Sequence, residues 1–242
     1  MREDENIYEK LIEYFGFEED NINILEQTID TDTQLEYFEF SRNHNSKKSE
    51  EEIIEGKDVI FDKEVPIVQK KSTLVELASL NSIEAYRTIE KYLNHPNIKL
   101  HDWACLALQE CRMHLESALL DQSKVLITTG LGGKGLNIRY FIVLFTPDGE
   151  NLTKVQRDII TKELNFYLPQ EKAILEDIEF SECFASILAM IPIKVNLNNL
   201  FTKVIEECNQ IGNFLYKDFI ITNVKALNPE EIRELLRVNN IF

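Results

Sequence analysis

The sequence has no long apolar run. Its longest, CFASILAMIPI at residues 183–193, is about half the length needed to cross a bilayer, and it contains Pro192. The opening segment, MREDENIYEK, lacks the basic region and following apolar run of a secretory signal or transit peptide. These absences predict neither a membrane span nor export, and we expect a cytoplasmic protein without membrane contact.

Cysteine is scarce, with four residues in a chain of 242. So few cysteines without an export signal favour free thiols in a reducing compartment over a disulfide framework. The chain is long enough to bury a sizeable core, because 44% of its residues are hydrophobic. We therefore expect one large or two ordinary globular domains that fold without disulfides.

Histidine and cysteine gather between His95 and His114, a stretch that holds three of the four histidines and two of the cysteines. Such clustering is typical of zinc sites, but tetrahedral ligation requires the side chains to converge. On the helix predicted there, His101 and Cys105 share one face, whereas Cys111 and His114 point away from it. We expect buried thiols, surface histidines and no metal.

Basic residues are outnumbered: 26 Lys and Arg stand against 42 Asp and Glu, a net charge of −16. Residues 1–64 hold 20 acidic and 7 basic residues, whereas the remaining 178 hold 22 and 19. Because such a field repels phosphate, we expect no nucleic-acid partner. The same field permits a basic protein partner, and a merely solubilising surface explains it equally well.

Familiar catalytic motifs are missing. The chain has no G-x-S-x-G nucleophile elbow and neither the H-R-D nor the D-F-G string of a protein kinase. Asp177 and Glu179 lie one strand period apart, but alternating acids on an exposed strand are ordinary. The sequence thus indicates no catalytic residues and no cofactor, and it favours a protein that is not an enzyme.

Glycine is also scarce, yet four of the eight glycines lie in GLGGKG at residues 130–135, with the spacing G-x-G-x-x-G. A P-loop needs Lys and then Ser or Thr directly after the last glycine, but Lys134 precedes Gly135 here. A dinucleotide fingerprint needs a following helix, but LNIRYFIVLF is typical of a strand. Both nucleotide-binding motifs are therefore excluded.

Two interpretations of this glycine loop remain open. Glycines supply positive φ angles, so the loop fits the tight turn of a β-hairpin. Alternatively, its backbone amides and two nearby cations form an anion site. The candidate anion-binding residues are Gly130, Gly132, Gly133, Lys134, Gly135 and Arg139.

Helical periodicity dominates residues 1–121, which we expect to form an acidic, all-helical region. A short amphipathic helix is predicted at 7–15. Residues 41–58 are polar and lose periodicity, which predicts a flexible linker or loop. Two further helices are predicted at about 82–93 and 99–119, separated by the break NHPN.

The helical hairpin at residues 74–119 resembles a HEAT repeat. The matching letters are LASLNSIEAYRTIEKYL, HPN and ACLAL, although HDWACLAL lacks the arginine that commonly opens the alanine stretch of the second helix. The resemblance implies a protein-interaction scaffold that needs neighbouring helices to bury its faces. The candidate contact surface comprises Tyr86, His101, Asp102 and Trp103.

From residue 122 the pattern becomes mixed: strand, strand, helix, strand, strand, helix, strand, helix. Thr153, Asn196 and Asn228 are predicted helix N-caps. Without the first strand and the last helix, the order is βαββαβ, the ferredoxin-like arrangement of an antiparallel sheet with two helices on one face. We thus expect an α+β chain, helical at 1–121 and ferredoxin-like at 122–242.

These features favour a non-enzymatic protein-interaction or regulatory protein, one version of which neutralises a basic partner. A second version is a homo-oligomer whose C-terminal sheets pair edge to edge. The alternative belongs to a different class: a small-molecule or phosphate-binding sensor or enzyme that uses the loop at 130–135.

Overall fold

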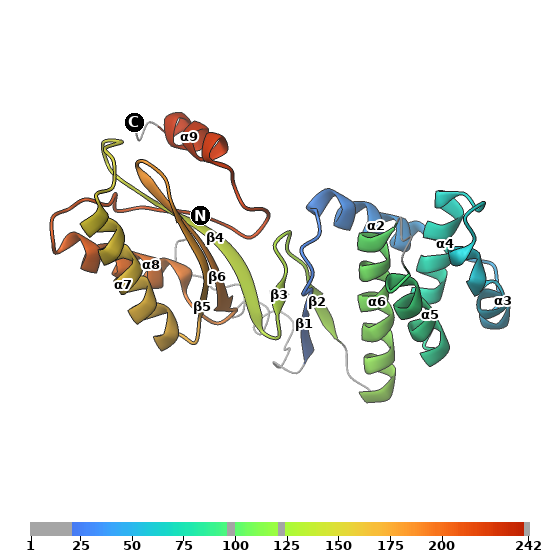
Figure 1. Ribbon diagram of the computed structural model, residues 1–242. Helices are drawn as coiled ribbons and strands as arrows, with labels where there is room; N and C mark the ends of the chain where they lie inside the picture. The colour runs from blue at the N-terminus through green and yellow to red at the C-terminus, as the bar shows by residue number, and fades with distance from the viewer. Residues whose placement is uncertain (1–20, 96–99, 121–123, 240–242) are drawn as a thin grey trace. The chain divides into compact units, whose positions relative to one another are not determined.

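The chain is organised as two units. The structure, a computed structural model, describes residues 21–95, 100–120 and 124–239 (Figure 1). Contacts divide the chain between Thr128 and Thr129, into a helical unit (Asp20–Thr128) and a sheet unit that includes Thr129–Phe242. The helix expected at 7–15 lies outside the described residues. Helices and strands both contribute to the fold, which confirms the α+β class.

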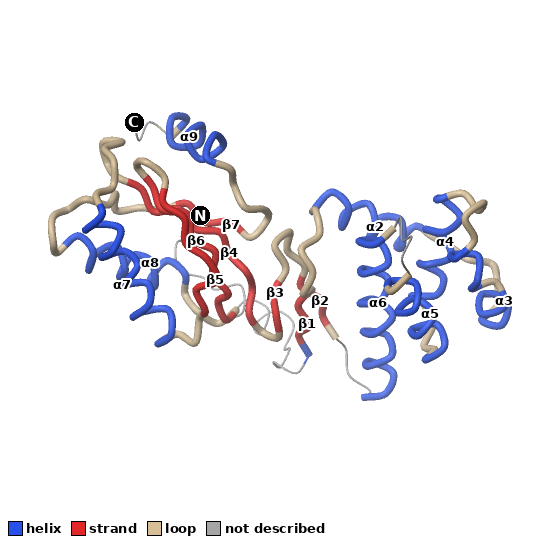
Figure 2. The backbone as a smooth tube through the Cα atoms, viewed as in Figure 1, coloured by secondary structure: helices blue, strands red, loops and turns tan. Residues whose placement is uncertain are grey.

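The helical unit consists of helices and one pair of short strands (Figure 2). Its elements are β1 (Ile22–Ile24), α2 (Thr31–Asn43), α3 (Glu50–Glu55), the 3₁₀ helix η2 (Lys57–Phe61), α4 (Ile67–Ala78), α5 (Ile83–Leu93), α6 (His101–Leu120) and β2 (Val125–Ile127). In the part of the chain that the structure describes, no helix is both long and apolar enough to cross a membrane.

The expectation that residues 1–121 are all-helical is wrong at β1. β1 and β2 pair as a parallel two-stranded sheet, with Ile22 opposite Val125 and Ile24 opposite Ile127. β1 is only three residues long, so it gives no clear period in the sequence, and its partner β2 lies about a hundred residues away along the chain. The pairing assigns the strand at 125–127 to the helical unit, although the sequence placed it in the C-terminal domain.

The polar stretch at 41–58 contains two short helices, α3 and the start of η2. Ser49 forms a capping box with Glu52, in which each side chain accepts a hydrogen bond from the other residue's backbone amide. Ile53 supplies one buried anchor to the core. The prediction of a linker or loop is therefore wrong for the residues in these helices, because the capping box and the apolar contacts of Ile53 and Ile54 stabilise a helix without a longer apolar period.

Helices α4, α5 and α6 form the core of the helical unit. α5 and α6 correspond to the helices predicted from the sequence, and Ser82 caps α5 by accepting a hydrogen bond from the Ala85 amide. α6 packs against α2, α4 and α5. Its side chains Trp103, Leu106 and Cys111 are almost completely buried in this core. The start of α6 is thereby held against its neighbouring helices.

The sheet unit combines an antiparallel sheet with helices. Its described elements are β3 (Gly133–Lys134), β4 (Asn137–Phe145), α7 (Lys154–Gln170), β5 (Ile174–Phe180), β6 (Phe184–Pro192), α8 (Leu197–Asn209), β7 (Ile220–Thr222) and α9 (Pro229–Val238). The predicted N-caps are confirmed, because the side chains of Thr153, Asn196 and Asn228 each accept a backbone hydrogen bond at the start of α7, α8 and α9.

β4 is the central strand of this sheet. It pairs with β6 over its whole length, from Asn137 opposite Pro192 to Phe145 opposite Phe184, and β6 pairs in turn with β5. The other edge of β4 pairs with β7 and, nearer its start, with β3. The order along the sheet is thus β7, β4, β6, β5, and every neighbouring pair is antiparallel.

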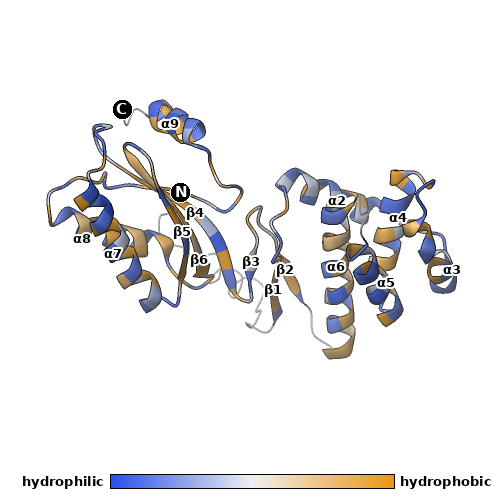
Figure 3. Ribbon diagram, in the orientation of Figure 1, coloured by the Kyte–Doolittle hydropathy of each residue, from blue (hydrophilic) through white to orange (hydrophobic). Residues whose placement is uncertain are grey.

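Helices cover both faces of the sheet (Figure 1). α7 packs against α8 and β5 on one face. On the other face, Phe141 and Val143 of β4 belong to a buried cluster with Ile232 and Leu236 of α9. Figure 3 shows α9 with both hydrophobic and hydrophilic residues, as expected of a helix with one buried face.

Candidate functional site

The structure places the four predicted contact residues in different surroundings. His101 and Asp102 stand at the start of α6 with side chains 57% and 48% exposed, and His101 Nδ1 lies 3.0 Å from Asp102 Oδ1. Tyr86 is half-buried on α5 and packs against the core. Trp103 is only 2% exposed, so the expectation that it forms an outer contact surface is wrong. Its ring is enclosed by aromatic and charged side chains from α2 and α4.

Three of these residues nevertheless line one surface hollow, which we call the α6 hollow. It has a volume of about 300 Å³, and its lining comes from three helices: Thr33 and Glu36 from α2, Lys71 from α4, and Leu100, His101, Asp102 and Trp103 from the start of α6. The sequence pointed to the α6 residues alone. Thr33, Glu36 and Lys71 were missed because only tertiary packing brings α2 and α4 to this place.

Helix capping, helix spacing and the helix dipole explain how the acidic side chains that line the α6 hollow are positioned. Asp30 caps α2 by accepting hydrogen bonds from the amides of Asp32 and Thr33. Thr33 and Glu36 are three residues apart and so lie on the same face of the helix. Asp102 occupies the first turn of α6, where the helix dipole favours a carboxylate.

Lys71 of α4 contacts residues of α2 and α6, the two other helices that line the α6 hollow. Its Nζ donates a hydrogen bond to Glu36 Oε1 at 2.6 Å and lies 4.0 Å from the centroid of the Trp103 ring. An ammonium group is attracted both by a carboxylate and by the face of an indole ring. The Glu36 side chain stays 59% exposed, whereas that of Lys71 is 18% exposed. The carboxylate is thus accessible from solvent while it is paired.

Ring packing, and not hydrogen bonding, fixes Trp103. Tyr37 and Phe40 meet its ring edge to face, with centroids 5.1 and 5.6 Å away. Tyr37 is anchored in turn, because its hydroxyl donates to Glu110 Oε2 at 2.5 Å, and burial raises the pKa of Tyr37 well above 10.0. The indole Nε1 of Trp103 is buried and has no hydrogen-bond partner among the described residues.

The α6 hollow does not have the geometry of a nucleophilic site. Cys105 Sγ lies 3.8 Å from His101 Nδ1 and 4.0 Å from Nε2, so it is aligned with neither nitrogen alone, and its shorter contact is with Nδ1, which Asp102 also contacts. A Cys-His-Asp relay needs the acid and the thiol on opposite ring nitrogens, so that one orients the ring while the other is deprotonated. Burial, and then the charge of Asp102, raise the pKa of Cys105 to about 11, which keeps the thiol protonated at neutral pH.

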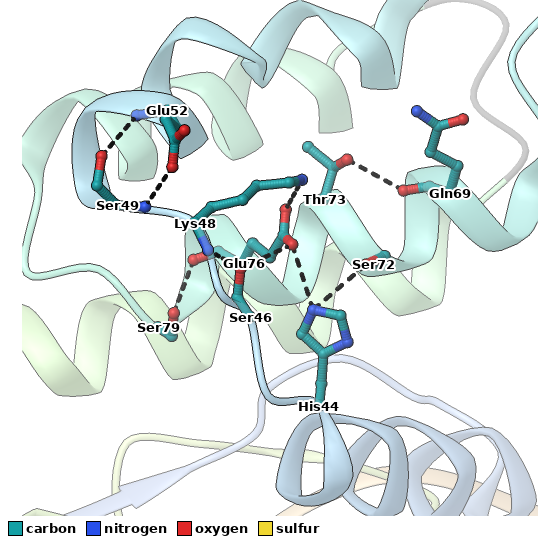
Figure 4. Close-up of polar contacts among 10 residues, drawn as sticks. All are labelled: His44, Ser46, Lys48, Ser49, Glu52, Gln69, Ser72, Thr73, Glu76 and Ser79. Atoms are coloured by element: carbon teal, nitrogen blue, oxygen red, sulfur yellow. Dashed lines mark hydrogen bonds and ion pairs between the residues drawn. The ribbon is translucent and has the colours of Figure 1, made fainter.

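A second polar cluster, around Glu76 of α4, was not found from the sequence (Figure 4). The Glu76 side chain is 4% exposed and accepts hydrogen bonds from Lys48 Nζ at 2.8 Å and Ser46 Oγ at 3.0 Å, with His44 Nε2 at 3.3 Å. Ser72 Oγ lies 3.3 Å from the same His44 nitrogen, so these groups also fail the relay geometry. The cluster attaches the connection between α2 and α3 to α4 and is structural.

The glycine loop forms a β-hairpin turn. Gly133 and Lys134 of β3 pair with Ile138 and Asn137 of β4, which leaves Gly135 and Leu136 as a two-residue connection. Gly135 has φ +58°, a conformation that favours glycine.

One of the two candidate cations of this loop, Arg139, is already paired within the fold. Lys134 is exposed on β3, whereas the Arg139 guanidinium binds Glu176 and the Leu131 carbonyl. The loop therefore lacks one of the two cations that the anion interpretation invoked.

Metal ligation has no geometric support in the ranges 21–95, 100–120 and 124–239. Within them, no three His, Cys, Asp or Glu side chains are grouped so as to hold a metal ion. The four cysteines Cys105, Cys111, Cys183 and Cys208 are all buried and free.

Comparison with known proteins gives little. No protein-family model matches the chain, and no curated protein matches it. Among solved structures, the chain is similar to the crystal structure of a "putative transposase" from Deinococcus radiodurans R1, with 10% sequence identity and a TM-score of 0.36. That match covers 43% of this chain and 91% of the other. At this score the likeness supports no conclusion on fold or function.

Proposed function

We propose that the protein is a non-enzymatic protein-binding protein, and that its helical unit holds a basic partner at the α6 hollow. The observation that carries this proposal is that two exposed carboxylates, those of Glu36 and Asp102, line the same surface hollow. Binding hot spots concentrate where charged and aromatic side chains share a pocket. A partner's arginine or lysine matches this chemistry, because its cationic group pairs with carboxylates.

The charge of the helical unit supports a basic partner. Residues 20–128 hold 20 Asp and Glu against 12 Lys and Arg, a net of −8. A field of this sign raises the rate at which a cationic surface associates. Lys71 of the chain itself contacts Glu36 and the Trp103 ring, which supports the preference of these walls for a cationic group.

Three finer assignments belong to the same proposal. The packing of α4, α5 and α6 supports a HEAT-like scaffold, in which neighbouring helices bury the faces of the hairpin. The sheet order β7, β4, β6, β5 with α7 and α8 supports the ferredoxin-like arrangement for the sheet unit. Four free, buried cysteines support a reducing compartment such as the cytoplasm.

A homo-oligomer built by edge-to-edge pairing of β5 is disfavoured. β5 pairs only with β6 among the described strands, and it carries a bulge between Leu175 and Asp177. Glu176, Asp177 and Glu179 would face like charges in a symmetric pair. Bulges and charges are the usual means by which edge strands avoid pairing with another copy.

The test is affinity capture with the tagged full-length chain from its native cytosol, eluted in steps of rising salt. Wild type is compared with Glu36→Gln/Asp102→Asn, which removes two carboxylates from the α6 hollow. The matched control is Glu55→Gln/Glu90→Gln, which removes two exposed carboxylates elsewhere on the same unit. Retained proteins are identified by mass spectrometry.

We expect a basic protein that elutes early with salt, is retained by the control, and is lost by the α6-hollow variant. A partner that binds all three proteins equally would remove the α6 hollow from the interface. A partner lost from both variants equally would show that overall charge, and not this site, holds it.

A further inference from the structure

The sheet unit contains a second and larger hollow, which we call the lysine hollow. Its volume is about 450 Å³, within the range of small-molecule sites. It lies where the end of α7 and the start of α8 meet the segment that follows β6. The lining residues are Tyr167, Gln170, Glu171, Lys172, Pro192, Lys194, Val195, Asn196, Asn199, Leu200 and Lys203.

The charge of this lining contrasts with the rest of the chain. It holds the three lysines Lys172, Lys194 and Lys203 and a single carboxylate, that of Glu171, in a protein of net charge −16. The lysines come from three separate segments, so the fold and not a local charge run brings them together. All three lysines are exposed residues that line the hollow.

The local geometry positions two of these lysines. Lys172 follows the end of α7 with φ +57°, in a left-handed conformation that favours glycine at helix ends. Lys203 Nζ lies 4.9 Å from the centroid of the Tyr167 ring, which restrains its long side chain. Neither lysine forms an ion pair with a described acidic residue closer than 4.0 Å.

Amide groups complete the lining. Gln170, Asn196 and Asn199 each bring a side-chain amide to the lining. Gln170 Nε2 donates to the Phe166 carbonyl at 3.1 Å, and Asn196 Oδ1 accepts from the backbone amide of Asn199 at the start of α8. Ammonium groups and amide donors are the partners that phosphate oxygens take in proteins. The lining has one aromatic ring, Tyr167, beside which a ligand of moderate size fits.

We propose that the lysine hollow binds a small molecule that carries phosphate groups. The site is independent of the α6 hollow, because all of its lining residues belong to the sheet unit. It also differs from the glycine loop, although the two are connected: the Ile193 amide donates a hydrogen bond to the Leu136 carbonyl at 3.0 Å. The phosphate ligand is held by lysines 172, 194 and 203, and Lys134 takes no part.

The experiment titrates the full-length protein with inorganic pyrophosphate by isothermal calorimetry, at two salt concentrations. The site variant is Lys172→Gln/Lys194→Gln/Lys203→Gln. The matched control, Lys154→Gln/Lys162→Gln/Lys217→Gln, removes the same charge from exposed lysines of the sheet unit outside the hollow. A fourth protein, Lys134→Gln, tests the glycine loop, and sulfate replaces pyrophosphate in a parallel titration.

We expect saturable binding of pyrophosphate that weakens with salt, and an affinity at least about tenfold lower in the site variant. The control and Lys134→Gln should change the affinity by less than about twofold. Wild-type protein that shows no saturable binding would overturn the proposal. Equal losses in the site variant and the control, or sulfate that binds as tightly as pyrophosphate, would reduce the effect to general ion attraction and would also overturn it.

Discussion

Arg139 of β4 and Glu176 of β5 form a two-point ion pair across the intervening strand β6. Nε donates to Glu176 Oε2 at 2.6 Å, and Nη2 donates to Oε1 at 3.0 Å. A third bond runs from Nη1 to the Leu131 carbonyl at 2.7 Å, which fixes the start of the glycine loop. The hydrogen bond with Glu176 raises the pKa of Arg139, so the guanidinium stays charged and its hydrogen bonds join β4, β5 and the glycine loop.

The first prediction concerns this ion pair. Arg139→Lys should lower the free energy of unfolding by about 1 kcal/mol, because an ammonium cannot make parallel bonds to the carboxylate and also reach the Leu131 carbonyl. Urea denaturation followed by circular dichroism measures the change. Arg237→Lys, at an exposed site on α9, is the control and should have almost no effect. Equal stability of wild type and Arg139→Lys would contradict the structural role.

The glycine loop leads to a second prediction, which compares two of its glycines. A Cβ at Gly130 would lie 1.7 Å from the Val224 carbonyl oxygen, whereas a Cβ at Gly135 would meet nothing within 4 Å. Gly130→Ala should therefore destabilise the protein by at least about 3 kcal/mol. Gly135→Ala should cost about 1 kcal/mol, because its φ of +58° disfavours any other residue. Thermal unfolding measures the stability of both variants. If Gly135→Ala were more destabilising than Gly130→Ala, the result would contradict this assignment of the two glycines.

These glycines show what the sequence determines and what it leaves open. Hairpin geometry follows from local preferences, and so do the N-caps Thr153, Asn196 and Asn228. The close approach of Gly130 to Val224 does not follow, since it joins residues that are remote in the chain.

The residues of the candidate sites also fall into two groups: those that the sequence indicated and those that only tertiary packing brings together. His101 and Asp102 lie within one predicted helix, so the sequence indicated them. Their companions Glu36 and Lys71 come from α2 and α4, and the three lysines of the lysine hollow come from separate segments. Burial of Trp103 was missed for a related reason: the helical period identifies its face of α6, but not the neighbours Tyr37 and Phe40 that cover it.

A third prediction is a pH dependence that arises from Glu76. Burial alone would raise its pKa, but hydrogen bonds from Lys48, His44 and Ser46 outweigh burial, so the folded-state pKa lies below 4.5. The charged carboxylate therefore contributes stability above about pH 4.5, and this contribution is lost as the pH falls through the lower folded-state value.

Glu76→Gln should thus be less stable than wild type by about 1–3 kcal/mol at pH 7, and the difference should shrink below pH 4. Urea titrations at several pH values measure it. The exposed Glu90→Gln serves as the control and should track wild type throughout. A difference that stayed constant with pH would show that the charge of Glu76 is not the stabilising feature.

The cysteines give a fourth prediction. Burial is the main cause that raises the pKa of Cys105 and Cys111 to about 11 and that of Cys208 to about 12, and it also raises the pKa of Cys183. Thiolates are the reactive species, so a disulfide reagent at pH 8 should label the native protein slowly. Four thiols should react at once in guanidinium. Rapid labelling of one cysteine in the native protein would contradict its burial.

The last prediction tests how Trp103 is held, and the chain's single tryptophan makes the comparison direct. Because its Nε1 has no hydrogen-bond partner among the described residues, Trp103→Phe loses ring area but no hydrogen bond. We expect it to lower the free energy of unfolding by less than about 1.5 kcal/mol, whereas Trp103→Ala should cost about 3–5 kcal/mol through the cavity that it leaves. Urea denaturation followed by circular dichroism measures both variants. Equal destabilisation by Trp103→Phe and Trp103→Ala would contradict this prediction, because it would require a hydrogen bond from the indole nitrogen. The packing of Tyr37, Phe40 and Lys71 around the ring provides no such bond.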